Sequence, residues 1–223
     1  MLESSLDLAF DLPAAAVLAA DTAFWQLYDS SFSSREREPH DVILATVHTG
    51  AGLVVRARSA GLTIGLTCTH MLCDPPVAFL VYLAVAPALR SRHIGAALFE
   101  QARLHSAEHY SSKNLIPAGL VWEVEIPALV ASDEREFEQR RRRIAFFERL
   151  GGRILPQRYL QPPVDGIAPV LMHLMFRPVP GAPFPDAAAT AALIHAIYFE
   201  KYRVANGIPR KTLDELLRQT MPA

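Results

Sequence analysis

Hydrophobic and polar residues along the first 72 positions predict one helix followed by a series of strands. Apolar side chains recur near helical spacing over residues 14–32, which predicts a helix after a short strand over 6–12. Segments rich in β-branched residues follow at 42–49, 53–57 and 62–72, with glycines between them. These segments predict a meander of three strands.

The middle of the chain alternates between strand and helix patterns. Residues 77–85 are a nearly unbroken apolar run, as expected for a strand that is covered on both faces of a sheet. Pro87 ends this strand, and apolar residues at helical spacing follow. The elements that remain are a helix ending near residue 110, a strand over 120–126, a helix over 133–150, and strands over 153–156 and 170–176. This order predicts a mixed α/β fold.

A change of composition at Pro178 predicts a division of the chain into a domain over 1–178 and an extension over 179–223. Four prolines between 178 and 185 predict a stiff connector, and two helices are expected after it, at 186–205 and 212–219. The first of these helices has a broad apolar face. We expect this face to pack back onto the same domain, and the alternative is a contact between two copies in a homodimer.

The composition excludes several classes of protein. The chain of 223 residues is 51% hydrophobic and 20% charged, and its formal charge is 22 − 23 = −1, which argues against disorder and against a strongly basic nucleic-acid binder. The longest apolar run, over 77–89, is interrupted by Pro87 and too short to span a membrane. Glu3 and Asp7 stand where a signal peptide carries positive charge. We therefore expect a soluble cytoplasmic protein.

Three further patterns have a structural interpretation. Strand alternation places Cys68 and His70 on one face and Cys73 on the other, which argues against a metal site. The arginine run over 140–143 is surrounded by glutamates at helical spacing, so it predicts a salt-bridged helix surface and not a nucleic-acid site. The chain has no Gly-x-Ser-x-Gly sequence, which argues against a serine hydrolase.

Residues 83–98 carry the most informative pattern. A buried strand runs through Pro87 into an arginine-containing loop that opens directly into a helix. The first amides of a helix lack intrahelical partners and carry partial positive charge, and the side chains of Arg90 and Arg92 add to it. Small residues that let a backbone approach a ligand are Ser91, Gly95 and Ala96. The segment therefore predicts a cradle for a pyrophosphate group.

Three segments, in chain order, resemble motifs of the GNAT superfamily of acetyl-CoA-dependent N-acetyltransferases. The first reads Val85-Ala86-Pro87 and then Arg90-Ser91-Arg92-His93-Ile94-Gly95, similar to Val-x-Pro followed by Arg/Gln-x-x-Gly-x-Gly/Ala, with His93 at the first glycine. Trp122-Glu123-Val124-Glu125 resembles the Leu-Glu-Val-Arg strand of the ribosomal-protein N-terminal acetyltransferases. Residues 143–152 resemble the later Ala-x-x-Phe-Tyr-Glu-x-Leu-Gly-Phe signature.

The resemblance implies a GNAT-like, mostly antiparallel central sheet, flanked by helices and splayed between the strands 77–85 and 120–126, with acetyl-CoA in the opening as co-substrate. The backbone of Leu83, Ala84 and Val85 would pair with the pantetheine arm. The pyrophosphate would be held by the amides of Arg90, Ser91, Arg92, His93, Ile94, Gly95 and Ala96. The acceptor would be the amine of a small molecule or peptide.

Glu123 and Glu125 are the candidate catalytic residues. They are two positions apart in a strand and therefore project to the same face. A carboxylate whose pKa is raised could remove the proton that an amine must lose before it attacks a thioester. Glu123 matches the glutamate that serves as base in the similar acetyltransferases, and Glu125 is the second candidate. The alternative is that either residue pairs with arginines of the 135–143 helix.

The general acid is not evident from the sequence, so we keep two hypotheses for the function. The family's Tyr position is Phe147, which cannot donate a proton, so either Tyr159 or another hydroxyl replaces it, or the thiolate leaves unprotonated. The first function is an N-acetyltransferase that acts on a primary amine. The second is a catalytically degenerate member of the fold that binds CoA or another ligand as a sensor or interaction module.

Overall fold

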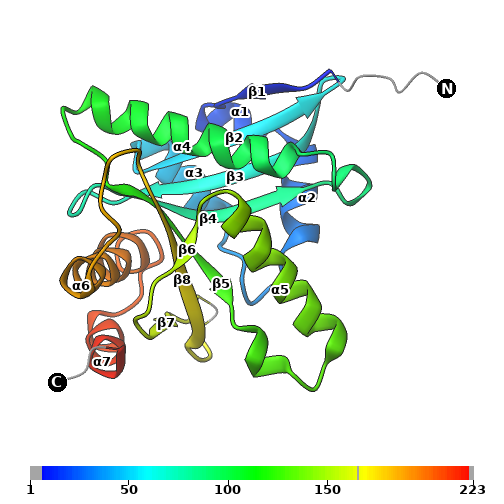
Figure 1. The fold of residues 1–223 in the computed structure, drawn as a ribbon. Helices are drawn as coiled ribbons and strands as arrows, with labels where there is room; N and C mark the ends of the chain where they lie inside the picture. Colours follow the sequence, from blue (N-terminus) through cyan, green and yellow to red (C-terminus); the bar gives the residue numbers. More distant parts are fainter. Residues whose placement is uncertain (1–6, 165, 221–223) are drawn as a thin grey trace. The chain divides into compact units, whose positions relative to one another are not determined.

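A computed structural model describes residues 7–164 and 166–220 of the chain (Figure 1). The described residues form two compact units. The first comprises residues 7–71 and 80–113, and the second comprises 72–79, 114–164 and 166–220. The predicted extension over 179–223 lies, as far as it is described, in the second unit, and the predicted boundary at 178 stays a prediction.

The first unit is built on antiparallel strands. Strand β1 (Ala9–Asp11) pairs with β2 (Gly52–Ser59), which pairs in turn with β3 (Leu62–Met71). Strand β4 (Val77–Val85) follows β3 in the order of the sheet, and its residues 80–85 belong to this unit. The strands predicted at 53–57, 62–72 and 77–85 are therefore confirmed.

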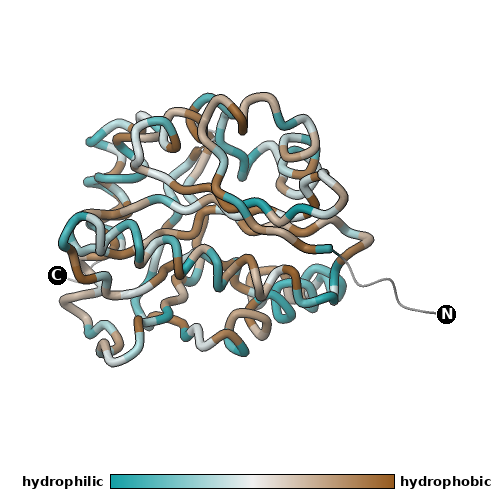
Figure 2. Tube along the Cα trace, turned by 90° about the horizontal axis from the view of Figure 1, so that it is seen from above, coloured by the Kyte–Doolittle hydropathy of each residue, from teal (hydrophilic) through white to brown (hydrophobic). Residues whose placement is uncertain are grey.

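Helices pack on both faces of these strands. Their bounds are α1 (Ala15–Ala19), α2 (Thr22–Ser31), α3 (His40–Thr49), the 3-10 turn η1 (Pro87–Leu89) and α4 (Ile94–Ser112). The neighbours Val54 and Val55 belong to different apolar clusters, because adjacent strand residues point to opposite faces. Val54 packs with α1, α2 and α3, whereas Val55 packs with Ile94 and Leu98 of α4. The helices change repeatedly between hydrophobic and hydrophilic along their length (Figure 2).

The N-terminal elements differ from the prediction in two places. The strand predicted over 42–49 is wrong, because these residues lie in α3. Pro39 precedes that helix with extended backbone, and Gly50 ends it in the left-handed conformation at φ 72°, so both ends carry helix-boundary residues. The helix predicted over 14–32 is divided into α1 and α2. Asp21 separates them and caps α2, since its carboxylate accepts a hydrogen bond from the Phe24 amide at 2.9 Å.

The second unit contains β5 (Gly119–Glu125), which pairs antiparallel with β8 (Val170–Pro178). The short strands β6 (Arg153–Ile154) and β7 (Tyr159–Gln161) also pair antiparallel with β8, and the sequence did not predict β7. The turn η2 (Pro127–Val130) leads from β5 into the predicted helix α5 (Glu134–Arg149).

Gly152 is required where the chain leaves α5. A Cβ atom at this position would lie 2.5 Å from the indole of Trp122 and 3.0 Å from the carbonyl oxygen of Phe147. The glycine therefore allows the chain to pass directly over Trp122, whose ring centroid lies 4.9 Å from that of Phe147. Trp122 and Phe147 are both buried, so the two GNAT-like segments after residue 120 form one part of the core of this unit.

The C-terminal helices pack within the second unit, but only part of the predicted apolar face is buried there. Helix α6 (Ala187–Ala196) continues into one π-helical segment, η3 (Ile197–Tyr202), and α7 (Arg210–Thr220) follows. Of the predicted apolar face, Tyr198 and Tyr202 are buried, whereas Ala188, Ala192 and His195 are exposed. The Tyr198 hydroxyl donates a hydrogen bond to the carbonyl oxygen of Leu160 at 2.5 Å. The mixed α/β fold class with mostly antiparallel strands and flanking helices is thereby confirmed. A homodimer stays an untested alternative.

Candidate active site

The loop from β4 to α4 holds four of the ten predicted cofactor-binding residues, at positions 90–93. Ser91 and His93 adopt the left-handed conformation at φ 64° and 60°, and His93 is the residue before the first turn of α4. His93 makes no side-chain cap, so no cap bond from it occupies the first amides of the helix. The side chains of Ser91, Arg92 and His93 are exposed, whereas Ile94 is buried against β2 and fixes the start of the helix.

The other predicted cofactor residues adjoin this loop in the first unit. Leu83, Ala84 and Val85 form the end of β4, and only Leu83 among them is half-buried. The Arg90 side chain is exposed and folds back, because its Nε donates a 3.4 Å hydrogen bond to the carbonyl oxygen of Val85. Gly95 and Ala96 lie in the first turn of α4 and are half-buried. The loop therefore presents both arginines and the helix start on the surface of this unit.

Glu123 of β5 lies at the centre of a hydrogen-bonded cluster in the second unit. The Tyr202 hydroxyl lies 2.8 Å from its Oε1 and 3.1 Å from its Oε2, and Gln161 Nε2 donates to Oε2 at 2.6 Å. The Tyr159 hydroxyl donates to Oε1. The expected alternative, a pairing of Glu123 with arginines of the 135–143 helix, is thus not the arrangement found among its described contacts.

The environment of Glu123 perturbs its acid–base properties. Burial raises the pKa of the Glu123 carboxyl above its usual value of 4.5, against the hydrogen bonds from Tyr159, Tyr202 and Gln161 and the positive charge of Lys201, which lower it. Burial and the neighbouring Glu123 charge also raise the pKa of the Tyr159 hydroxyl well above 10.0. Glu123 is therefore a stronger base than an exposed glutamate, and Tyr159 keeps its proton near neutral pH.

Glu125 has different partners. Its Oε1 lies 3.2 Å from Arg140 Nη2, and its Oε2 forms a close ion pair with Arg143 Nη1. The alternative expected for this residue, a pairing with arginines of α5, is therefore the arrangement in the structure. The two ion pairs hold β5 against α5, whereas a role of Glu125 in proton transfer stays a prediction.

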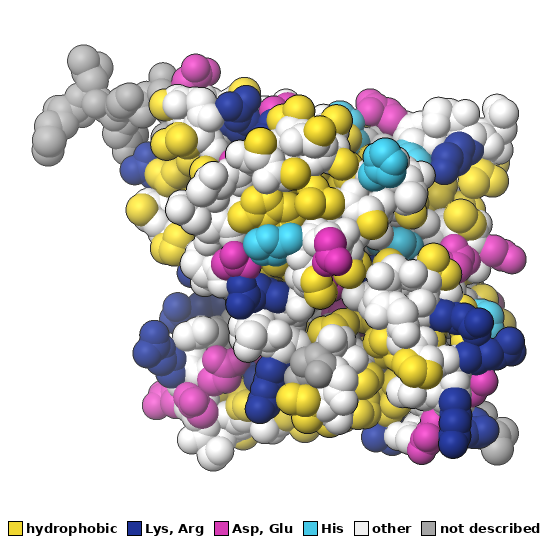
Figure 3. All heavy atoms as spheres, turned by 180° about the vertical axis from the view of Figure 1, so that it is seen from behind, with side chains coloured by type: hydrophobic (Ala, Val, Ile, Leu, Met, Phe, Trp, Pro, Cys, Tyr) yellow, Lys and Arg dark blue, Asp and Glu magenta, His cyan; other side chains and the backbone are white. Residues whose placement is uncertain are grey.

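The rest of the arginine run is also balanced by acids. Arg140 Nε lies 2.9 Å from Glu136 Oε1, and Arg141 Nη1 lies 3.0 Å from Glu138 Oε1. Figure 3 shows lysine and arginine side chains interspersed with acidic ones on the face it draws. The salt-bridged helix surface predicted for residues 140–143 is confirmed.

The structure adds two site residues that sequence reasoning missed, Gln161 and Tyr202. Gln161 lies on β7, which is too short to give a periodic pattern. Tyr202 lies 79 positions after Glu123 and belongs to the extension. The only sequence signal for Tyr202 is the spacing of four residues from Tyr198 on one apolar helix face.

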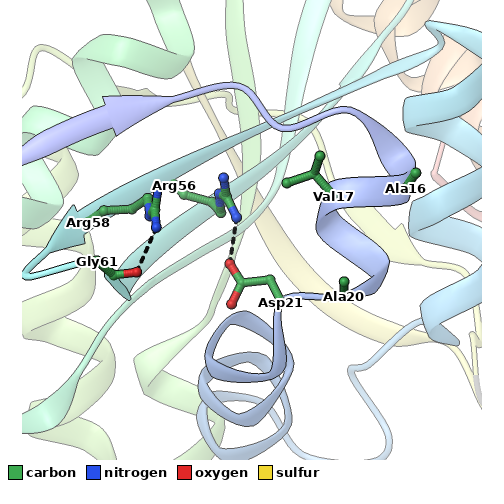
Figure 4. A pocket seen from close by; sticks show the side chains of 7 residues that line it. All are labelled: Ala16, Val17, Ala20, Asp21, Arg56, Arg58 and Gly61. Atoms are coloured by element: carbon green, nitrogen blue, oxygen red, sulfur yellow. Dashed lines mark hydrogen bonds and ion pairs between the residues drawn. The ribbon is translucent and has the colours of Figure 1, made fainter.

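A second group of charged residues lines an open pocket of about 530 Å³ in the first unit (Figure 4). Arg56 of β2 lies 2.8 Å from Asp11 Oδ2 and 2.6 Å from Asp21 Oδ2, and its side chain is only 7% exposed. Thr63 Oγ1 donates a further hydrogen bond to Asp21 Oδ2 at 2.6 Å. Arg56 thus joins β1, β2 and the start of α2, so we interpret this group as a structural clamp.

The described residues contain neither a membrane-spanning helix nor a cluster of metal-binding side chains. No helix in 7–164 or 166–220 is long and apolar enough to cross a membrane. In the same part of the chain, no group of three or more histidine, cysteine, aspartate or glutamate side chains could hold a metal ion, and Cys68 is buried while Cys73 is exposed.

Comparison with known proteins places the fold. No protein-family model matches the chain, and no curated protein matches its sequence. A solved structure from Bacteroides thetaiotaomicron, assigned to the GNAT family of acetyltransferases, has a TM-score of 0.67 and 20% identity, covering 90% of this chain and 99% of that chain. Arabidopsis thaliana NAA60, in complex with acetyl-CoA, has a TM-score of 0.55 and 16% identity over 78% and 99% of the two chains. An aminoglycoside 6'-N-acetyltransferase complexed with coenzyme A gives 0.57 and 14%, over 80% and 99%. The chain therefore has the fold of the GNAT acetyltransferases, as its three motifs predict.

Proposed function

We propose that the protein is an N-acetyltransferase that transfers the acetyl group of acetyl-CoA to a primary amine, with Glu123 as the general base. The observation that carries this proposal is the raised pKa of the Glu123 carboxyl, which is buried among hydroxyl and amide donors. A perturbed carboxyl on the strand that carries the base in similar acetyltransferases supports a catalytic role. The GNAT fold, which includes neighbours solved with acetyl-CoA or coenzyme A, supports the donor.

The loop between β4 and α4 fits the phosphates of acetyl-CoA. Its helix start lacks a side-chain cap, and Arg90 and Arg92 are exposed beside it. Backbone amides at a helix start and forked guanidinium groups are both good donors to phosphate oxygens. In this proposal the amides of residues 90–96 hold the pyrophosphate, and the backbone of residues 83–85 pairs with the pantetheine arm. When bound, acetyl-CoA supplies an acetyl group activated as a thioester.

Each residue of the Glu123 cluster then has a separate task. Glu123 takes the proton that the amine loses, directly or through water, and its raised pKa makes it a better acceptor. Tyr159 orients the carboxylate through its hydrogen bond and is a poor proton donor, because its pKa lies well above 10.0. Tyr159 is therefore not the general acid in this proposal. The CoA thiolate can leave without protonation, since a thiol has a pKa of about 8.5.

The test is an acetyl-transfer assay on a panel of amines, which follows the release of free thiol. Glu123→Gln should lower kcat by about 10²–10⁴-fold, because that is the usual contribution of a general base. Glu125→Gln is the matched control on the same strand and should lose far less, since Glu125 is held by arginines. Acetyl-CoA should raise the melting temperature of all three proteins alike.

Two outcomes would contradict the proposal. Unchanged turnover in folded Glu123→Gln would show that Glu123 is not the base. Stabilisation by acetyl-CoA without thiol release from any amine would instead support the second function, a catalytically degenerate protein that binds CoA as a sensor or interaction module.

A further inference from the structure

The C-terminal extension contacts the carboxylate of the proposed base. Tyr202, the last residue of η3, is 2% exposed, and its hydroxyl lies within hydrogen-bond distance of both oxygens of Glu123, at 2.8 and 3.1 Å. The motifs that resemble the GNAT family end before residue 178, so this contact comes from a part of the chain outside them. The hydroxyl of Tyr202 is also 3.4 Å from Gln161 Nε2, and thus belongs to the same network.

The residue before Tyr202 adds a buried positive charge. Lys201 is 1% exposed, and its Nζ donates a hydrogen bond to Asn206 Oδ1 at 3.0 Å. Its charge favours the ionised form of Glu123. Burying an ammonium group is costly unless nearby groups stabilise its charge, so its position is unusual for a helix that serves only to cover the core.

The π-helical backbone provides a second, independent observation. Residues 197–202 are the one π-helical segment among the described residues, and such segments are rare and frequent at functional sites. Tyr198, Lys201 and Tyr202 are all buried in this short segment. The chain thus departs from regular α-helix at the place where it contributes two polar side chains to the surroundings of Glu123.

We propose that Tyr202, with Lys201 beside it, is a positioning residue of the acetyltransferase: it holds the Glu123 carboxylate in place and keeps it ionised, so that the extension over 179–223 is part of the catalytic machinery. This inference rests on the proposed role of Glu123 as base. Tyr202 acts through Glu123, and no contact of Tyr202 with substrate is needed.

Loss of the Tyr202 hydroxyl or of the Lys201 charge should change the pKa of Glu123 in one direction. The titratable and charged groups that act on Glu123 are Tyr159 of β7 and Lys201 and Tyr202 of η3. The charge of Glu123 in turn raises the pKa of Tyr198, which faces it from η3. A hydrogen bond or positive charge that favours the carboxylate lowers its pKa, so removing one raises it. Loss of the Tyr202 hydroxyl should therefore raise the pKa of Glu123, since hydrogen bonds to charged groups are the strong ones.

The test compares Tyr202→Phe with Tyr198→Phe. Both tyrosines are buried in η3, but the Tyr198 hydroxyl donates to the backbone of Leu160 and not to Glu123. In Tyr202→Phe, the acid limb of the pH profile of kcat/KM should move to higher pH, and in Tyr198→Phe it should stay in place. Lys201→Met is a second variant and should move the limb in the same direction as Tyr202→Phe.

A titration without substrate separates this inference from the proposed function. The carboxyl carbon of Glu123 is followed by ¹³C NMR in each folded variant, and Glu123→Gln identifies its signal by the loss of that signal. If the wild type transfers no acetyl group, the proposed function fails, and the NMR titration still decides whether Tyr202 controls Glu123. An unchanged Glu123 titration in folded Tyr202→Phe, or an equal change in Tyr198→Phe, would overturn the inference.

Discussion

His93 offers a direct test of the loop that we assign to phosphate binding. Its φ of 60° lies in the left-handed region, where a non-glycine residue costs about 1–2 kcal/mol relative to its usual conformations. His93→Gly removes that cost. Glycine also increases the entropy of the unfolded chain, which destabilises the folded protein by about 0.5–1 kcal/mol. The net expectation is a stabilisation of about 0.5–1 kcal/mol, or about 1–4 °C in Tm for a chain of this size.

The assay compares His93→Gly with His93→Ala by thermal and urea unfolding. Alanine removes the imidazole but keeps the Cβ atom, so it retains the backbone strain. The His93 side chain is exposed and makes no cap bond, so alanine should change stability by less than about 0.5 kcal/mol. If glycine proves no more stable than alanine, the reasoning from backbone strain is refuted.

The same two variants test how the His93 imidazole affects the binding of acetyl-CoA. The GNAT motif has glycine at this position, and the structure keeps the left-handed backbone with histidine in its place. If both variants bind acetyl-CoA more tightly than the wild type, the imidazole crowds the pyrophosphate. If both bind more weakly, it donates to the phosphates, and the difference between glycine and alanine measures the effect of loop flexibility.

Two other predictions concern the contribution of charged groups to the stability of the protein. Burial raises the folded-state pKa of Glu123 above 4.5, so the free energy of unfolding of the wild type falls as pH rises from 4.5 toward that raised pKa. The urea midpoint of Glu123→Gln relative to that of the wild type should therefore increase between about pH 4 and about pH 8. A difference that does not change with pH would contradict this. Arg56→Met leaves the largely covered Asp21 without its arginine and should cost about 3–5 kcal/mol in urea unfolding. Arg58→Met loses an exposed 3.6 Å pair with Asp11 and an exposed hydrogen bond to the Gly61 carbonyl, and should cost about 0–1 kcal/mol; equal losses would refute the clamp.

Most elements of the fold could be predicted from the sequence, and the error over 42–49 shows why one could not. Val42, Ile43 and Val47 are β-branched and favour strands, but that preference is weak and depends on context. The boundaries Pro39 and Gly50 are compatible with a helix, and the protein places Ile43 in the same apolar core as Val54. Packing of a helix face on the sheet therefore outweighed the intrinsic preference of the segment.

The candidate site could be predicted only where its residues are close in sequence. The loop over 90–96 is a continuous segment, so its pattern can be read directly, and Glu123 is identified by its position in a strand. Tyr159, Gln161 and Tyr202 reach Glu123 across 36, 38 and 79 positions. No periodicity links residues at such separations, because they meet only through the pairing of β7 with β8 and the packing of η3.

The acid–base strength of Glu123 depends on residues outside its own strand. The motif on β5 indicates which group is the proposed base, but the strength of a base depends on its burial and on the donors around it. For Glu123 those donors come from β7 and from the extension, which lie outside the strand and loop segments that resemble the GNAT family. A chain with the same strand but without Tyr202 and Lys201 would present the same carboxylate with a higher pKa, and so a smaller ionised fraction at a given pH. The control that we propose for the extension, over the pH range in which Glu123 accepts a proton, therefore depends on contacts that the motif does not contain.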